Sequence, residues 1–108
     1  MDELGPNHTT ATGKSWAIYM GKDKFALLDY ADYVRLRVYH WQAKKSKACW
    51  YAVRKVRTNG KTTYIKMHRE IMNAPPGTHV HHKNLDSLDN RRDNLFVCTP
   101  KTHRLFHQ

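Results

Sequence analysis

Short runs of apolar and β-branched residues, separated by turn residues, recur along the chain. Two such runs, at 15–20 and 25–29, lie on either side of a polar turn and predict a pair of short strands. Residues 48–67 contain two longer runs joined through Asn59-Gly60, which is the strongest short-range signal for a β-hairpin. The pattern therefore predicts that the first part of the chain is rich in β-structure.

Two segments have apolar residues at helical spacing. Residues 30–41 place Tyr33 and Leu36 on one side of a short helix, although the same residues also favour strands. Residues 68–74 predict a second short helix, which the Pro-Pro-Gly sequence at 75–77 ends. These helices would be interspersed among the strands.

The last part of the chain predicts a strand at 78–82, a polar loop at 83–93 and a strand at 94–98. A final helix begins at Thr99, because threonine is a good N-cap and Pro100 would occupy the first helical position, where its missing N–H costs nothing. The fold class is therefore α+β, with a β-rich part at 15–67 after a flexible polar tail at 1–14.

The composition is that of one small globular domain. The 108 residues are 40% apolar, and no apolar run is long enough to cross a membrane. The first fifteen residues lack an apolar stretch after a basic start, so we expect no signal peptide. Cys49 and Cys98 lie far apart and form no paired motif, which favours a reduced, cytoplasmic protein.

The charge is strongly positive and unevenly distributed. The net charge is +10, and residues 33–69 contain eleven Lys and Arg but no Asp or Glu. Such a block attracts phosphate backbones. The alternatives are a basic surface without a specific partner and a segment that contacts anionic lipid. No amphipathic helix carries the block, which disfavours contact with lipid. We expect double-stranded DNA as the partner and no membrane. The candidate DNA contacts are Arg54, Lys55, Arg57, Lys61, Arg69, Arg91, Arg92 and Arg104.

Five of the eight histidines lie between residue 78 and the last residue: His79, His81, His82, His103 and His107. On the final helix His103 and His107 would share a face, which is a common way to present two nitrogen ligands to one ion. Strand alternation separates His81 from His82, but a bend after them would let both face one cleft. Three imidazoles suit zinc, nickel or manganese better than magnesium, and a remaining histidine could accept a proton from water.

The stretch HVHHKNLDSLDNRRDNLFVCTPKTHRLFH resembles the ββα-metal motif of HNH endonucleases. It matches at His81-His82, at Asn94 twelve residues after His82, and at His103 nine residues after Asn94. The upstream MHREIMNAPPGTHVHH is similar to small HNH nucleases of phages and mobile introns, whereas the final TPKTHRLFH is similar to colicin-type DNases. The resemblance implies that residues 68–108 form the nuclease unit.

The resemblance also implies a role for each matched residue. His82 would be the general base, and Asn94 would bond across the loop to hold the two strands and orient that base. His81 and His103 would bind one divalent metal ion, with His107 as the additional ligand of the colicin-type branch. Because this set contains no carboxylate, the expected preference for Mg is lowered. The identity of the ion stays open among Zn, Ni, Mn and Mg.

The expected activity is hydrolysis of DNA phosphodiester bonds, one strand per active site, by a monomer or homodimer in the cytoplasm of a bacterium or phage-infected host. One alternative is a non-catalytic DNA-binding protein in which the same histidines hold a structural zinc, with Cys98 or His79 completing the shell. Another is a metal-independent DNA- or RNA-binding module. Tolerance of His82→Ala and His103→Ala in a functional assay would favour that module.

Overall fold

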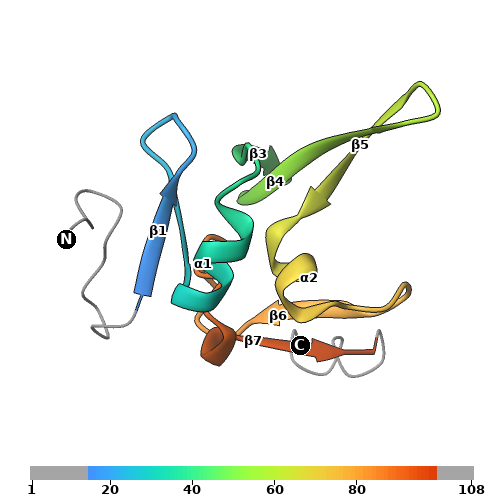
Figure 1. Ribbon diagram of the computed structural model, residues 1–108. Helices are drawn as coiled ribbons and strands as arrows, with labels where there is room; N and C mark the ends of the chain where they lie inside the picture. Colours follow the sequence, from blue (N-terminus) through green and yellow to red (C-terminus); the bar gives the residue numbers. More distant parts are fainter. Residues whose placement is uncertain (1–14, 100–108) are drawn as a thin grey trace.

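Within the part of the chain that the structure describes, the fold consists of three small antiparallel sheets and two short α-helices (Figure 1). The computed structural model describes residues 15–99. The elements in chain order are β1 (Ser15–Tyr19), β2 (Phe25–Asp29), α1 (Tyr30–Leu36), β3 (Gln42–Ser46), β4 (Cys49–Thr58), β5 (Lys61–Lys66), α2 (Met67–Met72), β6 (His79–His82), the 3-10 turn η2 (Arg92–Asn94) and β7 (Leu95–Cys98). Strands predominate in this mixed arrangement, and no helix among the described residues is long and apolar enough to span a membrane.

The first hairpin and the helix after it agree with the sequence pattern. β1 pairs with β2 from Ser15 opposite Asp29 to Tyr19 opposite Phe25. α1 follows at once, and its Leu36 is fully buried. The helical interpretation of this segment is therefore confirmed, although the helix ends five residues earlier than the pattern indicated.

The Asn59-Gly60 hairpin is also confirmed. β4 pairs with β5 from Val53 opposite Lys66 to Thr58 opposite Lys61. Both turn residues have positive φ, 52° and 77°, which is the backbone of a type I′ turn. The hairpin projects from the rest of the molecule as a long arm (Figure 1).

A strand that the sequence pattern did not predict completes the central sheet. β3 is polar except for Ala43 and contains two adjacent lysines, but it pairs along its length with the first half of β4. Only Ala43 on β3 is buried, beside Trp41, which precedes the strand and is 2% exposed. β3 reaches no further than Val53, so beyond that residue β4 and β5 form a two-stranded ribbon.

One hydrophobic core joins the two parts of the chain that the sequence distinguished. Leu28, Leu36 and Met67 come from the first part, and they share a cluster with Val80 and Leu95 of the second. The backbone of the loop after β6 also bonds to β2, with two hydrogen bonds of 2.7–2.8 Å that involve Leu27. The first hairpin therefore supports the loop that carries the candidate nuclease residues.

The predicted tail at 1–14 and the predicted helix after Thr99 lie outside the described residues. The hairpin of β6 and β7 with its intervening loop is present as expected, and α2 begins one residue before the expected start. The helical part of the expected ββα unit falls in the undescribed segment.

Candidate active site

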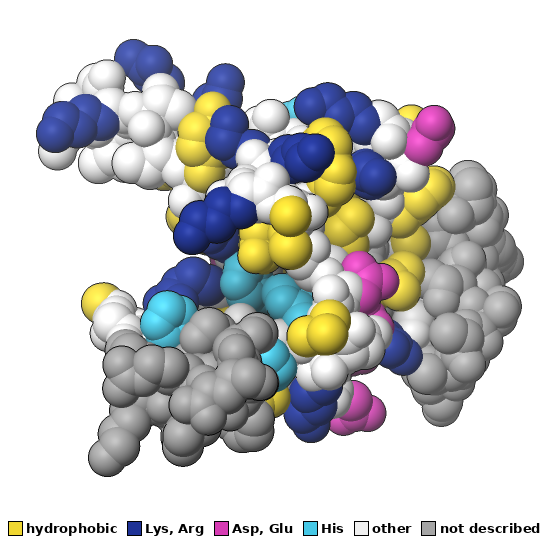
Figure 2. Space-filling view, turned by 180° about the vertical axis from the view of Figure 1, so that it is seen from behind, with side chains coloured by type: hydrophobic (Ala, Val, Ile, Leu, Met, Phe, Trp, Pro, Cys, Tyr) yellow, Lys and Arg dark blue, Asp and Glu magenta, His cyan; other side chains and the backbone are white. Residues whose placement is uncertain are grey.

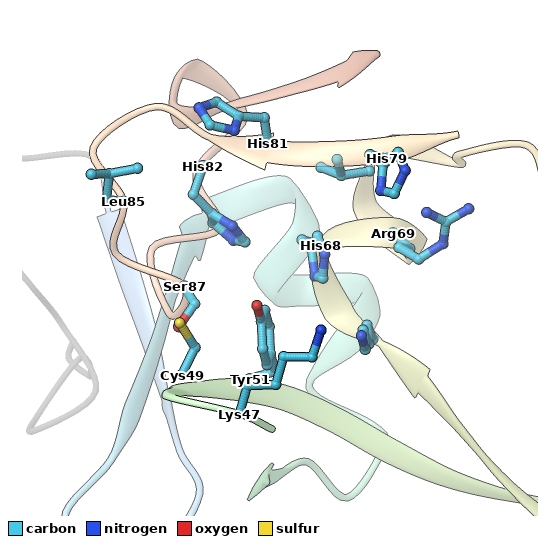
Figure 3. A pocket seen from close by; sticks show the side chains of 12 residues that line it. Lys47, Cys49, Tyr51, His68, Arg69, His79, His81, His82, Leu85 and Ser87 are labelled. Atoms are coloured by element: carbon cyan, nitrogen blue, oxygen red, sulfur yellow. The ribbon is translucent and has the colours of Figure 1, made fainter. Parts of the chain in front are cut away.

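The β6–β7 hairpin presents the two adjacent histidines. In the antiparallel register His81 lies opposite Phe96 and His82 opposite Leu95. The two imidazoles leave the strand on opposite sides (Figure 3), and both are nearly buried. The His81 ring meets Phe96 edge-on, with 5.0 Å between ring centroids. Both histidines nevertheless line one pocket, as expected if they belong to a shared site.

Asn94 closes the loop between the two strands. Its side-chain amide donates to Asn84 Oδ1 at 2.9 Å and to the Asp89 carbonyl oxygen at 2.8 Å. Its Oδ1 accepts from the Asn84 backbone N–H at 3.0 Å, and its own carbonyl accepts from Lys83 at 2.8 Å. This is the cross-loop bonding that the resemblance implied for Asn94. Asn94 is buried, so these bonds satisfy groups that would otherwise be costly.

A buried carboxylate supports the same loop. Asp89 accepts two hydrogen bonds from the Arg91 guanidinium, at 2.7 and 2.6 Å, and one from the Asn84 side chain at 2.8 Å. Burial alone would raise the pKa of Asp89, but the hydrogen bonds and charge of Arg91, together with Asn84, lower it below its usual value. Asp89 therefore remains ionised and fixes the loop around it.

Asn90 holds the imidazole of His82. His82 Nε2 lies 2.8 Å from Asn90 Oδ1 in the interior of the protein. Asn90 is 1% exposed, and its backbone N–H donates to the Leu27 carbonyl at 2.7 Å, which fixes its position. Since an amide oxygen only accepts, a hydrogen bond in this geometry requires neutral His82 to carry its proton on Nε2, which would leave the lone pair on Nδ1. Burial lowers the pKa of His82, while Asn90 and the carboxylates of Asp86 and Asp89 act in the opposite direction.

His68 of α2 packs directly against His82. The two ring centroids are 4.8 Å apart, and the other side of His68 stacks on Tyr51 at 5.8 Å. Burial, followed by the proximity of His82, Lys66 and Arg69, lowers the pKa of His68 to about 3. His68 is therefore a neutral aromatic support at physiological pH. The structure places His68 in the packing around His82.

This burial gives a testable pH dependence. We expect the free energy of unfolding to fall as the pH decreases from about 6.5 towards 3, because the unfolded chain then binds a proton that folded His68 rejects. The slope is at most about 1.4 kcal/mol per pH unit, and the full contribution is present above pH ~6.5. Denaturant unfolding at several pH values measures it. His68→Phe keeps a ring against Tyr51 and should show a shallower slope; equal slopes would contradict this role.

The pocket beside these histidines is basic. It has a volume of about 440 Å³ and is open to solvent. The side chains that line it include Lys47, Lys66 and Arg69 as well as the histidines, and no Asp or Glu of residues 15–99 is among them. An anion is therefore the ligand that this pocket suits best.

The predicted DNA contacts fall into two groups. Lys55, Arg57 and Lys61 are exposed on the β4–β5 ribbon. The others that the structure describes make internal contacts: Arg54 with Glu70, Arg69 with the carbonyl oxygens of Thr78 and Pro75, Arg91 with Asp89, and Arg92 with Asp32. Arg104 lies outside the described residues. For the internal group a structural role is evident, and contact with DNA stays a prediction.

The predicted metal ligands are only partly within the described chain. His81 lies in the pocket, whereas His103 and His107 fall in the segment after residue 99. Residues 15–99 alone contain no group of three His, Cys, Asp or Glu side chains that could hold an ion. Cys98 is buried, and burial raises the pKa of its thiol, which disfavours the thiolate that zinc binds. A metal site with three such ligands would therefore need at least one donor from outside residues 15–99.

Comparison with known proteins supports the interpretation of the C-terminal half. No curated protein and no solved structure matches the chain. Residues 73–105 do match the model of one protein family, described as HNH endonuclease. The matched segment contains His81, His82, Asn90, Asn94 and His103, whereas Lys47, Lys66 and His68, which line the pocket, lie outside it.

Proposed function

We propose that the protein is a metal-dependent endonuclease that hydrolyses phosphodiester bonds in double-stranded DNA. The observation that carries the proposal is the setting of His82: a buried imidazole whose Nε2 is held by Asn90, at the edge of a basic pocket. The family match over residues 73–105 supports the same activity. The segment after residue 99 would complete the site.

In this mechanism His82 acts as the general base. Its Nδ1 accepts a proton from a water molecule, the water oxygen forms a bond to phosphorus, and the bond from phosphorus to the 3′ oxygen breaks. The lowered pKa of His82 keeps the imidazole neutral, which a base requires. Asn94 keeps the loop closed, so that Asn90 and His82 stay in register. Lys47, Lys66 and Arg69 provide positive charge for the phosphate.

His81, His103 and His107 are the residues that would hold the divalent ion. When bound, the ion would neutralise charge on the phosphate and on the departing 3′ oxygen. A donor set of three imidazoles is typical of transition metals such as zinc, nickel or manganese, and magnesium is less suited to it. With one such site per chain, we expect a monomer to nick one strand.

Conversion of supercoiled plasmid to open circle by the purified protein tests the proposal directly. Each of the four candidate ions is supplied in turn, and the products are separated on an agarose gel. Open circle that forms before linear DNA indicates nicking. If no ion supports any cleavage, the protein is not a nuclease of this kind.

Asn90 is expected to act as a positioning residue for His82. Asn90→Ala removes the acceptor for Nε2–H, so we expect kcat to fall roughly 10–100-fold, the usual effect of losing such a partner. Asn90→Asp keeps an oxygen at this position and should restore most of the rate. Imidazole ¹⁵N chemical shifts at pH 8 report the tautomer: Nε2–H in the wild type and a mixture in Asn90→Ala. A proton on Nδ1 in the wild type would contradict the assignment.

A further inference from the structure

The register of the central sheet places its cations on defined faces. Lys44 lies opposite Tyr51, Lys55 opposite Tyr64, and Lys66 opposite Val53. Because side chains alternate along a strand, one face carries the six residues that we call the cationic face: Lys44, Tyr51, Lys55, Arg57, Tyr64 and Lys66.

Arg54 lies on the other face of the sheet. Its guanidinium donates to both carboxylate oxygens of Glu70, at 2.9 and 3.2 Å, and lies over the ring of Tyr39. Arg54 is therefore occupied, whereas Lys55 and Arg57 are exposed. Lys61 is opposite Thr58 and therefore shares the face of Arg54. The four predicted DNA contacts on the ribbon are thus divided between its two faces.

The cationic face leads directly into the histidine pocket. Cys49 precedes Tyr51 with the same alternation, and Lys47 lies in the turn before β4; all three line the pocket together with Lys66 and His82. In Figure 3 Tyr51 rises from β4 towards His68 and His82. Figure 2 shows the projecting arm and the histidines on either side of a hollow, with Lys and Arg side chains between them. Lys66 belongs both to the cationic face and to the lining of the pocket, so the two adjoin.

The two tyrosines of this face are covered by ammonium groups. Lys44 Nζ lies 4.8 Å from the centroid of the Tyr64 ring, and Lys66 Nζ lies 4.9 Å from that of Tyr51. Single-stranded nucleic acids bind by stacking bases on open aromatic rings. Rings that are covered by lysines offer positive charge instead, which suits phosphates of a duplex whose bases remain paired.

We propose that the cationic face binds the phosphate backbone of duplex DNA on one side of the cleavage site and leads the scissile phosphate to His82. From Tyr51 to Arg57 the strand spans about 20 Å, which corresponds to roughly six base pairs. The cleavage step rests on the proposed function, but binding by this face does not require cleavage. The β4–β5 ribbon is in this view the arm that holds the substrate.

The test compares two double variants that lose the same charge. Lys55→Ala/Arg57→Ala removes two cations of the cationic face. Arg37→Ala/Lys45→Ala removes two exposed cations elsewhere, and Lys45 lies on the opposite face of the sheet. Binding of a labelled 30-base-pair duplex is measured by fluorescence anisotropy in EDTA at several salt concentrations, so the result is independent of cleavage. Far-UV circular dichroism and thermal melting confirm that each variant is folded.

For Lys55→Ala/Arg57→Ala we expect the slope of log Kd against log salt to decrease by about two, with affinity reduced roughly 10- to 100-fold at 0.1 M salt. The Arg37→Ala/Lys45→Ala variant should keep the wild-type slope. Equal losses in both variants, tighter binding of a single strand than of the duplex, or no binding by the wild type would each overturn the proposal. A protein that binds in this way but fails to cleave would refute only the nuclease function.

Discussion

Replacing His82 by alanine is expected to lower the rate of plasmid nicking by roughly 10²–10⁴-fold, the usual contribution of a general base. Alanine can neither accept the proton from water nor form the hydrogen bond between His82 Nε2 and Asn90 Oδ1. Duplex binding should remain, because Lys55 and Arg57 of the cationic face lie on the central sheet, whereas His82 lies on the β6–β7 sheet. Nicking rates are measured under single-turnover conditions, with binding measured separately in EDTA.

The control for this prediction is His79→Ala. His79 lies on the same strand and also lines the pocket, but its side chain is exposed, whereas that of His82 is buried. It should retain nicking close to the wild-type rate. His82→Ala leaves the Asn90 oxygen without a partner, so about 1–3 kcal/mol of stability is at risk and the assay is run well below the melting temperature. His82→Gln, which is closer in volume, serves as a second variant. Nicking that survives both substitutions would remove His82 from the mechanism.

The sequence predicted those elements whose conformation is set by residues close to one another in the chain. The Asn59-Gly60 turn dictates its hairpin because both positions accept positive φ. Strand β3 is different: its lysines carry no strand signal, and it becomes a strand only because β4 offers an edge to pair with. Such pairing is decided by tertiary structure, which a pattern along one segment does not contain.

The same distinction applies to the candidate site. The spacing of His81, His82 and Asn94 predicted a resemblance to HNH endonucleases that the family match over residues 73–105 supports, and those residues lie on one hairpin and its loop. Asn90 was missed because its importance depends on contacts with His82 and with the distant Leu27. An asparagine eight residues after a histidine is no signal by itself.

For Arg92 the sequence predicted a functional contact, whereas the structure shows a structural one. It was counted with the candidate phosphate contacts, but its guanidinium donates two 2.9 Å hydrogen bonds to Asp32, sixty residues away, which is 1% exposed. A buried carboxylate needs such a partner, so Arg92 has a structural role that no local pattern reveals. Charge counts along a sequence therefore indicate a partner class better than they indicate which cations contact it.

Removal of the divalent ion is expected to reduce nicking to the background of the assay. Protein stripped with EDTA and dialysed should recover activity on addition of Mn²⁺, Ni²⁺ or Zn²⁺ to a greater extent than with Mg²⁺, because the proposed ligands are imidazoles. His103→Ala should lose this recovery, since it removes a proposed ligand. The rate of open-circle formation at each ion concentration measures both effects.

The metal experiment also separates catalysis from the structural-zinc alternative. A catalytic ion contributes to the reaction, so EDTA should stop nicking while duplex binding and the melting temperature stay close to those of the untreated protein. A structural ion contributes folding free energy, so EDTA would lower the melting temperature and weaken binding together. Parallel loss of binding and stability would therefore favour the DNA-binding protein. Loss of cleavage alone would assign the ion to the chemistry at His82.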